Sequence, residues 1–240
     1  MVNIIKSDFY RIIKGKLGFI SALLIFLFGI LLVVIARDYT VKELIESTLS
    51  SGAIFMPIMI TNILVISWGH EFNYRTVNNA LISGISRMKY FISKVLLTFL
   101  LMTLFLIIYS MGLTLATLVF KGSVDLGYTL KILSAQFPMY LTVSSLGVLL
   151  FNVVNATYVS IMIFIVMAFI GDNIISMIIE TYFKKLDFLM DYLFISNISN
   201  VTNISVLTNT TILTYSTSAV ALTVIFIMIS YQTFKQKEFK

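Results

Sequence analysis

Six apolar runs of about 20 residues each dominate the sequence, and they decide which solvent the chain can fold in. Of the 240 residues, 59% are hydrophobic and only 12% are charged, whereas a water-soluble domain carries about 25% charged residues. A helix rises about 1.5 Å per residue, so about 20 apolar residues cross a hydrocarbon core of about 30 Å. The sequence therefore predicts an all-α integral membrane protein with a single membrane domain. The six predicted spans are residues 17–36, 52–69, 95–120, 132–151, 156–179 and 213–231.

Basic residues are distributed unequally between the segments that connect these spans. Cytoplasmic segments retain Lys and Arg, and with the N-terminus inside, the inner segments hold 11 of the 17 basic residues. Both termini are therefore predicted to be cytoplasmic. The net charge of +6 is explained by membrane topology, so we expect no nucleic-acid partner.

The absence of cysteine excludes disulfides, thiol nucleophiles and thiolate metal sites. A cysteine-free membrane protein rich in Ile, Asn and Lys is typical of a bacterial cell membrane, where we expect it to contact lipid.

Residues 1–16 precede the first span and show their own periodicity. Apolar residues recur there at spacings of 3, 4 and 3, and polar residues recur on another face, which predicts an amphipathic helix. We expect this interfacial helix to lie in the inner headgroup layer, with Phe9, Arg11 and Lys14 among its residues. The alternative is an ordinary basic flank of the first span.

The longest polar stretch on the cytoplasmic side is residues 70–94, between spans 2 and 3. Its apolar residues recur at spacings of 4, 4 and 3, which predicts a helix that packs on the membrane domain and presents polar side chains to a partner. A loop that only fixes topology is the alternative, but the connector at residues 152–155 shows that such a loop can be much shorter. The apolar residues are Val77, Leu81, Ile85 and Met88.

The outer connectors differ in length and composition. Residues 38–51 are predicted to form a helical cap over the first two spans, whereas residues 180–212 form a long extracytoplasmic segment. Gly171-Asp172-Asn173 is a helix-breaking cluster, so the fifth span is expected to end there. The turns that follow would then re-enter the membrane or lie on its outer face. Asp172 would be a helix-end group at the outer surface.

Few residues could support catalysis or hold a metal. The single histidine, His70, lies beside Glu71 at a predicted span end, and a metal site usually needs three or four ligands. The sequence contains no GxxxxGK[ST] phosphate loop, so any nucleotide hydrolysis would occur on another polypeptide.

The inner connector carries, in order, Glu71-Phe72, Arg75-Thr76-Val77, Gly84-Ile85-Ser86-Arg87, Tyr90-Phe91 and Ser93-Lys94. This stretch resembles the corresponding region of ABC-2 family permeases of ABC transporters. In that family, an acidic residue, a Gly-Thr pair, an xxSR turn and a terminal Lys surround the helix that contacts the ATPase. Arg75 stands where glycine is usual. The resemblance extends to Asp8-Phe9-Tyr10-Arg11 in the N-terminal helix, to the six spans and to the long outer segment.

The resemblance implies a permease subunit of an ATP-driven exporter, similar to small Gram-positive permeases for lantibiotic immunity or other antimicrobial-peptide export. Two permeases, identical or homologous, would assemble with two copies of a cytoplasmic ATPase. ATP and Mg would bind to that ATPase, and this chain would carry no cofactor or catalytic site. Asp172 and Asn173 would belong to an outer gate. The residues implied to contact the ATPase are Glu71, Thr76, Ser86, Arg87, Tyr90 and Lys94.

Two other functions are open at this point. A non-transporting anchor or assembly subunit would dock a cytoplasmic ATPase without a translocation path. An intramembrane enzyme is disfavoured by the single histidine, the missing cysteine and the scarcity of acidic residues within the spans.

Overall fold

The computed structural model describes residues 6, 8–10, 12, 14–73, 76–154 and 156–237, and they fold as helices joined by turns, without a β-strand. The all-α fold class is therefore confirmed for these residues. The π-helical turns are η1 and η2, and the 3-10 helices are η3 and η4. The elements are α2 (Lys16–Ile35), α3 (Val41–Leu64), η1 (Val65–Gly69), α4 (His70–Asn73), α5 (Thr76–Ile82), α6 (Arg87–Lys121), α7 (Leu126–Val153), α8 (Thr157–Val166), η2 (Met167–Gly171), α9 (Asp172–Tyr182), η3 (Lys184–Tyr192), α10 (Phe194–Asn200), η4 (Val201–Asn203) and α11 (Asn209–Gln236).

Among the described residues, six helical segments are long and apolar enough to cross a membrane, in agreement with the six predicted spans. Several helices extend beyond their apolar runs. α3 begins at Val41, so the separate cap predicted over residues 38–51 is wrong, and most of that segment forms the first turns of the second span. Thr40 starts this helix, because its Oγ1 accepts the N–H of Glu43 while the Glu43 carboxylate accepts the N–H of Thr40.

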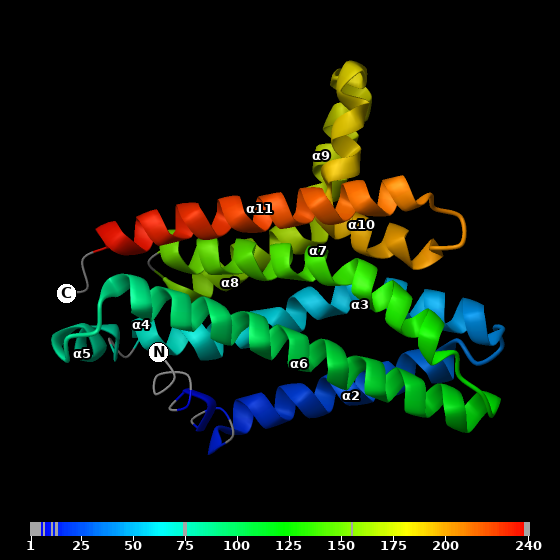
Figure 1. The fold of residues 1–240 in the computed structure, drawn as a ribbon, viewed down its shortest axis with the longest axis horizontal. Coiled ribbons are helices and arrows are strands. Elements are labelled where there is room, and N and C mark those ends of the chain that lie inside the picture. The colour runs from blue at the N-terminus through cyan, green and yellow to red at the C-terminus, as the bar shows by residue number, and fades with distance from the viewer. Residues whose placement is uncertain are drawn as a thin grey trace.

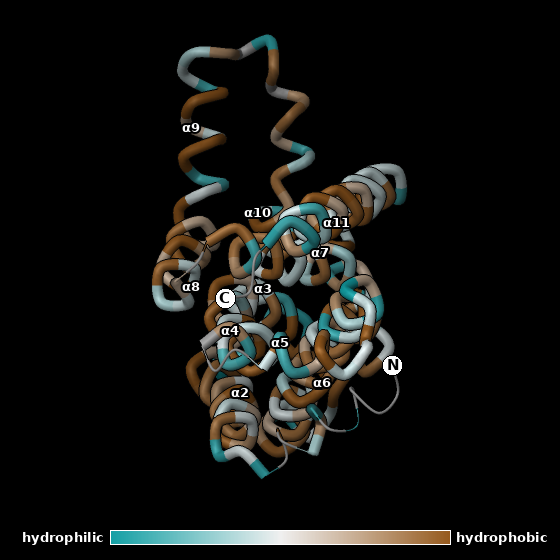
Figure 2. The backbone as a smooth tube through the Cα atoms, turned by 90° about the vertical axis from the view of Figure 1, so that its left-hand side faces the viewer, coloured by the Kyte–Doolittle hydropathy of each residue, from teal (hydrophilic) through white to brown (hydrophobic). Residues whose placement is uncertain are grey.

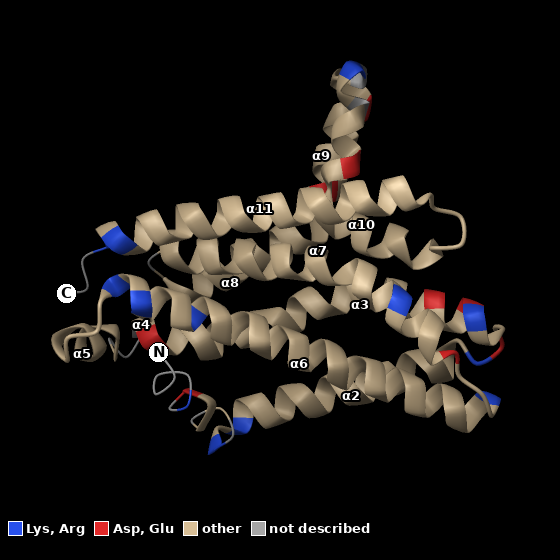
Figure 3. Cartoon of the chain, viewed as in Figure 1, with Lys and Arg blue, Asp and Glu red and all other residues tan. Residues whose placement is uncertain are grey.

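The long helices run side by side in one bundle (Figure 1). α7 packs on α11 and α2 packs on α6, while α3 contacts α2, α6 and α7. Apolar residues recur along all of these helices (Figure 2). Large apolar side chains are buried between the helices and also exposed on their outer surfaces, which is the pattern of helices surrounded by lipid. Charged residues gather at the two ends of the bundle and on the projecting α9 segment (Figure 3).

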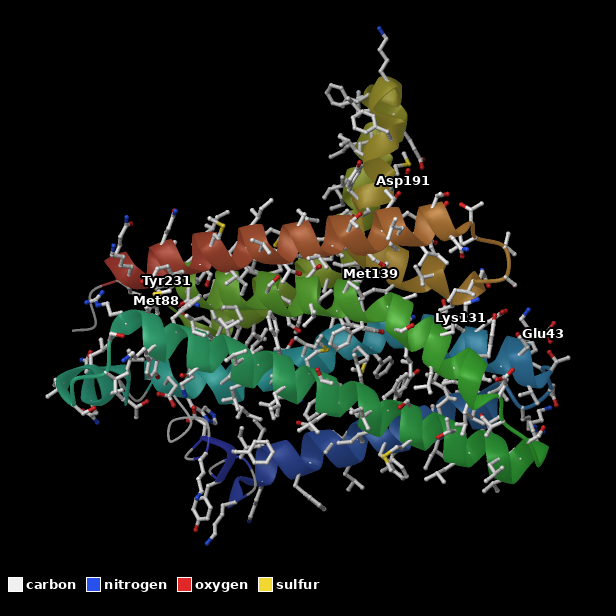
Figure 4. All side chains as sticks on the ribbon, in the orientation of Figure 1. Glu43, Met88, Lys131, Met139, Asp191 and Tyr231 are labelled. Atoms are coloured by element: carbon white, nitrogen blue, oxygen red, sulfur yellow. The ribbon has the colours of Figure 1, made fainter. Side chains whose placement is uncertain are left out.

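The two ends of the bundle are chemically distinct, and each can be followed from labelled residues. Met88 and Tyr231 lie at one end, Glu43 and Lys131 lie at the other, and Met139 lies between them (Figure 4). The first end also carries α4, α5 and the last turn of α11. We call this end, which is predicted to be cytoplasmic, the inner end, and we call the opposite one the outer end.

Two glycines allow α2 and α6 to approach closely. A Cβ atom on Gly29 would lie 2.8 Å from the carbonyl oxygen of Tyr109, and a Cβ on Gly112 would clash with the carbonyl oxygen of Phe26. Small residues at such crossings let two backbones meet in a membrane, where packing and not water exclusion drives helix association.

The fifth membrane segment changes direction partway along its length. α8 runs with the bundle, whereas α9 runs across it and projects from its side together with η3 (Figures 1 and 2). The backbone stays helical from Thr157 to Tyr182, so the predicted cluster Gly171-Asp172-Asn173 does not end the helix, but the direction changes there, where η2 ends and α9 begins. The turn before α9 is the π-helical η2, and π-bulges are a recognised cause of sharp helix bends.

The predicted interfacial helix falls partly outside the described residues, and Arg11 is among those not described. Lys6, residues 8–10, Ile12 and Lys14 are helical. Phe9 is half-buried and Lys14 is exposed, whereas Asp8 is buried at the inner end of the bundle.

Candidate functional site at the inner end

The connector between the second and third spans folds as a short helix between two longer ones. α5 ends at Ile82, and Gly84 then adopts a φ of +86° that a residue with a side chain rarely adopts. Ser86 starts α6 by accepting the N–H of Lys89 on its Oγ, at 3.4 Å.

The four apolar residues of this connector do not all lie on one buried helical face. Val77 is buried, and Leu81 and Ile85 are half-buried, as expected of a face packed on the bundle. Met88 belongs to α6 and is 55% exposed. The prediction of one continuous apolar face is therefore wrong at its last position, because the turn at Gly84 separates α5 from α6.

A buried cluster of three charged residues lies beside this connector. Lys94 is only 1% exposed, and its Nζ lies 2.7 Å from Asp8 Oδ2 and 3.1 Å from Glu71 Oε1. An ion removed from water is tolerated when partners of opposite charge replace its hydration. The cluster therefore ties the N-terminal residues, α4 and α6 to one another.

Glu71 extends this cluster into a network of hydroxyl groups. Its Oε2 accepts hydrogen bonds from Tyr90 Oη at 2.7 Å and from Thr76 Oγ1 at 2.5 Å. Lys94 Nζ also lies 5.4 Å from the centroid of the Tyr90 ring. Because Thr76 is the first residue of α5, Glu71 joins the start of α5 to the buried side of α6.

Arg87 fastens the other end of the connector to the end of α11. Its Nη1 donates to the carbonyl oxygens of Lys235 and Lys237, at 2.5 and 3.1 Å. Lys237 in turn donates from Nζ to the carbonyl oxygen of Asn152, at 3.2 Å, and lies over the ring of Phe72. Burial lowers the pKa of Lys237. These contacts join the start of α6 to the end of α11, and the end of α11 to the end of α7.

The interior next to the charged cluster is aromatic and closely packed. Trp68 in η1 is fully buried, and its ring lies 5.5 Å from that of Phe91 and 6.3 Å from that of Phe234. Trp68 Nε1 donates to Thr98 Oγ1, which donates to Ser67 Oγ, both at 3.1 Å. This packing excludes water from the side of the cluster that faces the bundle.

The six residues expected to contact a partner fall into three groups by exposure. Glu71, Tyr90 and Lys94 are buried and bonded to one another, and Thr76 and Arg87 are partly buried and hold the connector in place. Ser86 is exposed and caps α6. Other exposed side chains of the connector belong to Asn79, Ile82, Ser83, Met88 and Lys89. The sequence predicted exposure of the polar Asn79 and Lys89, which lie off the apolar face, but did not single out Ile82 or Ser83.

Asp8 is the functional residue that sequence reasoning missed. The N-terminal motif contains Asp8, but nothing in the sequence links this residue to Lys94, 86 residues later. The signal in the sequence was Lys94 itself, because a lysine at the start of a long apolar run needs a carboxylate partner.

The two residues expected at an outer gate lie where α9 begins. Asp172 is buried, and its Oδ2 accepts the N–H groups of Ile195 and Ser196, at 2.9 and 2.8 Å. The expectation of a helix-end group at the surface is therefore wrong, because Asp172 caps the start of α10. Asn173 is exposed. Both residues line a cavity of about 250 Å³ that α3 and α10 also border.

No family model matches this chain, and no curated protein matches it in sequence.

Proposed function

We propose that this chain is the membrane-spanning permease subunit of an ATP-driven exporter, which moves an amphipathic substrate outward with energy from a separate cytoplasmic ATPase. The observation that carries the proposal is the fixed position of α5 at the inner end. Glu71 holds the start of this helix, and Arg87 holds the turn that follows it. Between these points, Ile82 is 85% exposed, so its apolar side chain is free to contact a partner.

A force applied to α5 would pass into the membrane helices through defined contacts. Thr76 and Glu71 connect α5 to Tyr90 and Lys94 on α6. Arg87 connects the same region to α11. A partner that moved α5 would therefore act on both helices, because separation would break these hydrogen bonds and the Glu71–Lys94 ion pair.

We propose that the motif residues position the connector and that its exposed part makes the contact. In the proposed complex, Ile82 would enter an apolar depression of the ATPase, with Asn79 and Ser83 at its rim. Glu71, Tyr90 and Lys94 would pass movement of the docked α5 to α6. Two ATPases, carrying ATP and Mg, would serve two permeases, identical or homologous. The amphipathic substrate is proposed to be an antimicrobial or other peptide.

Cross-linking tests this docking surface, and the chain's lack of cysteine makes it specific. We expect Ile82→Cys to cross-link, through a photoactivated label, to an ABC-type ATPase encoded beside this chain, when the two are purified together. Met88→Cys is the matched control, because Met88 is exposed in the first turn of α6 but lies outside α5. Equal labelling of the ATPase from both positions, or from neither, would contradict docking through α5.

Transport separates an exporter from an anchor that merely docks an ATPase. Cells that produce both proteins should survive a higher concentration of a membrane-active peptide than cells whose ATPase lacks its phosphate-loop lysine. If the two strains are equally sensitive to every peptide tested while cross-linking at Ile82 persists, the chain is a docking subunit and the exporter proposal fails.

A further inference from the structure

α9 and η3 form a hairpin that leaves the side of the helix bundle (Figures 1 and 2). The described parts of the chain cover little of it, since most of its large apolar side chains are exposed. The apolar or aromatic residues exposed along the hairpin are Ile174, Ile175, Met177, Ile178, Tyr182, Phe183, Leu186, Phe188, Leu189 and Tyr192.

The residues of α9 are segregated by polarity around the helix. At about 100° per residue, Ile174, Ile178 and Tyr182 fall within one arc together with Ile175. Ser176 and Glu180 lie on the opposite side. An exposed helix divided in this way fits the boundary between hydrocarbon and water, and fits neither solvent alone.

The depth of the hairpin follows from the length of helix that precedes it. Thr157 lies level with the inner end of the second span, because a Cβ on Gly69 would lie 2.8 Å from Thr157 Cγ2. α8 has 10 residues and η2 has 5, and together they rise about 22 Å at about 1.5 Å per residue. A hydrocarbon core is about 30 Å thick. The chain therefore leaves the bundle before it has crossed the outer half of the membrane.

We propose that the α9–η3 hairpin lies in the plane of the outer leaflet, with its apolar face on the lipid acyl chains. Exposed apolar side chains of α8 and η2, among them Val166 and Ile170, lead up to those of α9 along the chain. Exposed tyrosine and phenylalanine rings along the hairpin suit the membrane interface. This assignment concerns the lipid contact alone and does not depend on the exporter proposal.

Lipid fits this surface better than a second copy of the chain does. The polar face of α9 and the exposed Lys185 at the hairpin tip keep their hydration in an interface, where a lysine can reach water or a headgroup. A close contact between two chains would instead remove the charges of Glu180 and Lys185 from water, at a cost in desolvation.

Depth-dependent quenching tests the proposal on the full-length chain in vesicles of phosphatidylcholine and phosphatidylglycerol. Ile178→Cys and Ser176→Cys, on opposite faces of α9, each carry an environment-sensitive fluorophore. Leu115→Cys on α6 is the control for a lipid-exposed position. Val206→Cys, at an 82% exposed position after η4, is the control for a water-exposed position at the outer end of the bundle.

We expect lipid-attached spin labels to quench the Ile178 probe as strongly as the Leu115 probe, and aqueous iodide to quench it several-fold less than the Val206 probe. The Ser176 probe should be quenched by iodide several-fold more than the Ile178 probe. Iodide quenching at Ile178 equal to that at Val206 would show a hairpin in water. Protection of Ile178 from both quenchers would show a protein contact. Either result overturns the proposal.

Discussion

Lys94 shows at the scale of one residue how the inner end is built. It begins the apolar part of a membrane span, yet its charge is buried between the carboxylates of Asp8 and Glu71. The lysine keeps these two like-charged groups close together, and they in turn make burial of the lysine tolerable. Each member of the cluster therefore depends on the other two.

Replacing Lys94 should destabilise the chain far more than replacing a neighbouring lysine. Lys94→Met leaves two carboxylates buried without a cation, and breaking a buried pair costs about 3–5 kcal/mol. Lys89→Met is the control, because Lys89 is exposed on the same helix. Thermal unfolding in detergent, followed by size-exclusion chromatography, compares the two. Adding Asp8→Asn and Glu71→Gln to Lys94→Met should recover part of the loss, and similar midpoints for both single variants would contradict the cluster's role.

At the scale of elements, close contact between helices depends on residues without side chains. α2 and α6 meet at Gly29 and Gly112, where an added Cβ would strike backbone atoms that cannot rotate away. Their lipid-facing sides carry large apolar residues such as Leu27 and Leu115. Gly29 on α2 and Gly112 on α6 therefore decide where the first span packs on the bundle.

The substitution Gly112→Ala should loosen this pair of helices. Overpacking costs about 1–3 kcal/mol, which outweighs the gain of up to about 1 kcal/mol that alanine brings to a helix. Gly127→Ala in α7 is the control, because its Cβ would meet only an ordinary contact at 3.5 Å. A lower unfolding midpoint for Gly112→Ala alone is the expected result. If both variants are as stable as the parent chain, the backbones of α2 and α6 are not in direct contact.

At the scale of the whole molecule, the two ends of the bundle differ in how firmly they are held. At the inner end, ionic and carbonyl contacts join the N-terminal residues, α4, α6, α7 and α11. At the outer end, the α9–η3 hairpin is held at its base by Asp172, whose carboxylate caps α10. Movement that starts at α5 would thus be shared among several spans. The hairpin, in contrast, would be free to move with the surrounding lipid.

Tyr90→Phe tests whether this rigidity matters for coupling. The substitution removes the hydroxyl that donates to Glu71 and keeps the ring, so we expect the fold to persist. The variant should bind the partner ATPase normally, but ATP hydrolysis stimulated by the permease should fall several-fold. Tyr158→Phe is the control, at an exposed position on α8. Unchanged stimulation in the Tyr90 variant would exclude a part for this hydroxyl in coupling.

The sequence by itself determined the solvent, the fold class and the number of spans. Long apolar runs need lipid, and within lipid the backbone satisfies its hydrogen bonds as helices. The sequence also drew attention to residues 71–94, because polar residues there interrupt two such runs. These properties are local, so composition and periodicity are enough to predict them.

Only the tertiary structure decided what the individual polar residues do. Glu71, Tyr90 and Lys94 look like contact residues in the sequence but are buried partners of one another, and Asp8 joins them from the far end of the chain. Asp172 looks like a surface residue but caps a helix that begins 22 residues later. Periodicity describes the neighbours of a residue along one helix. The partner of a buried charge depends on which helices lie side by side, and that is set by packing across the whole bundle.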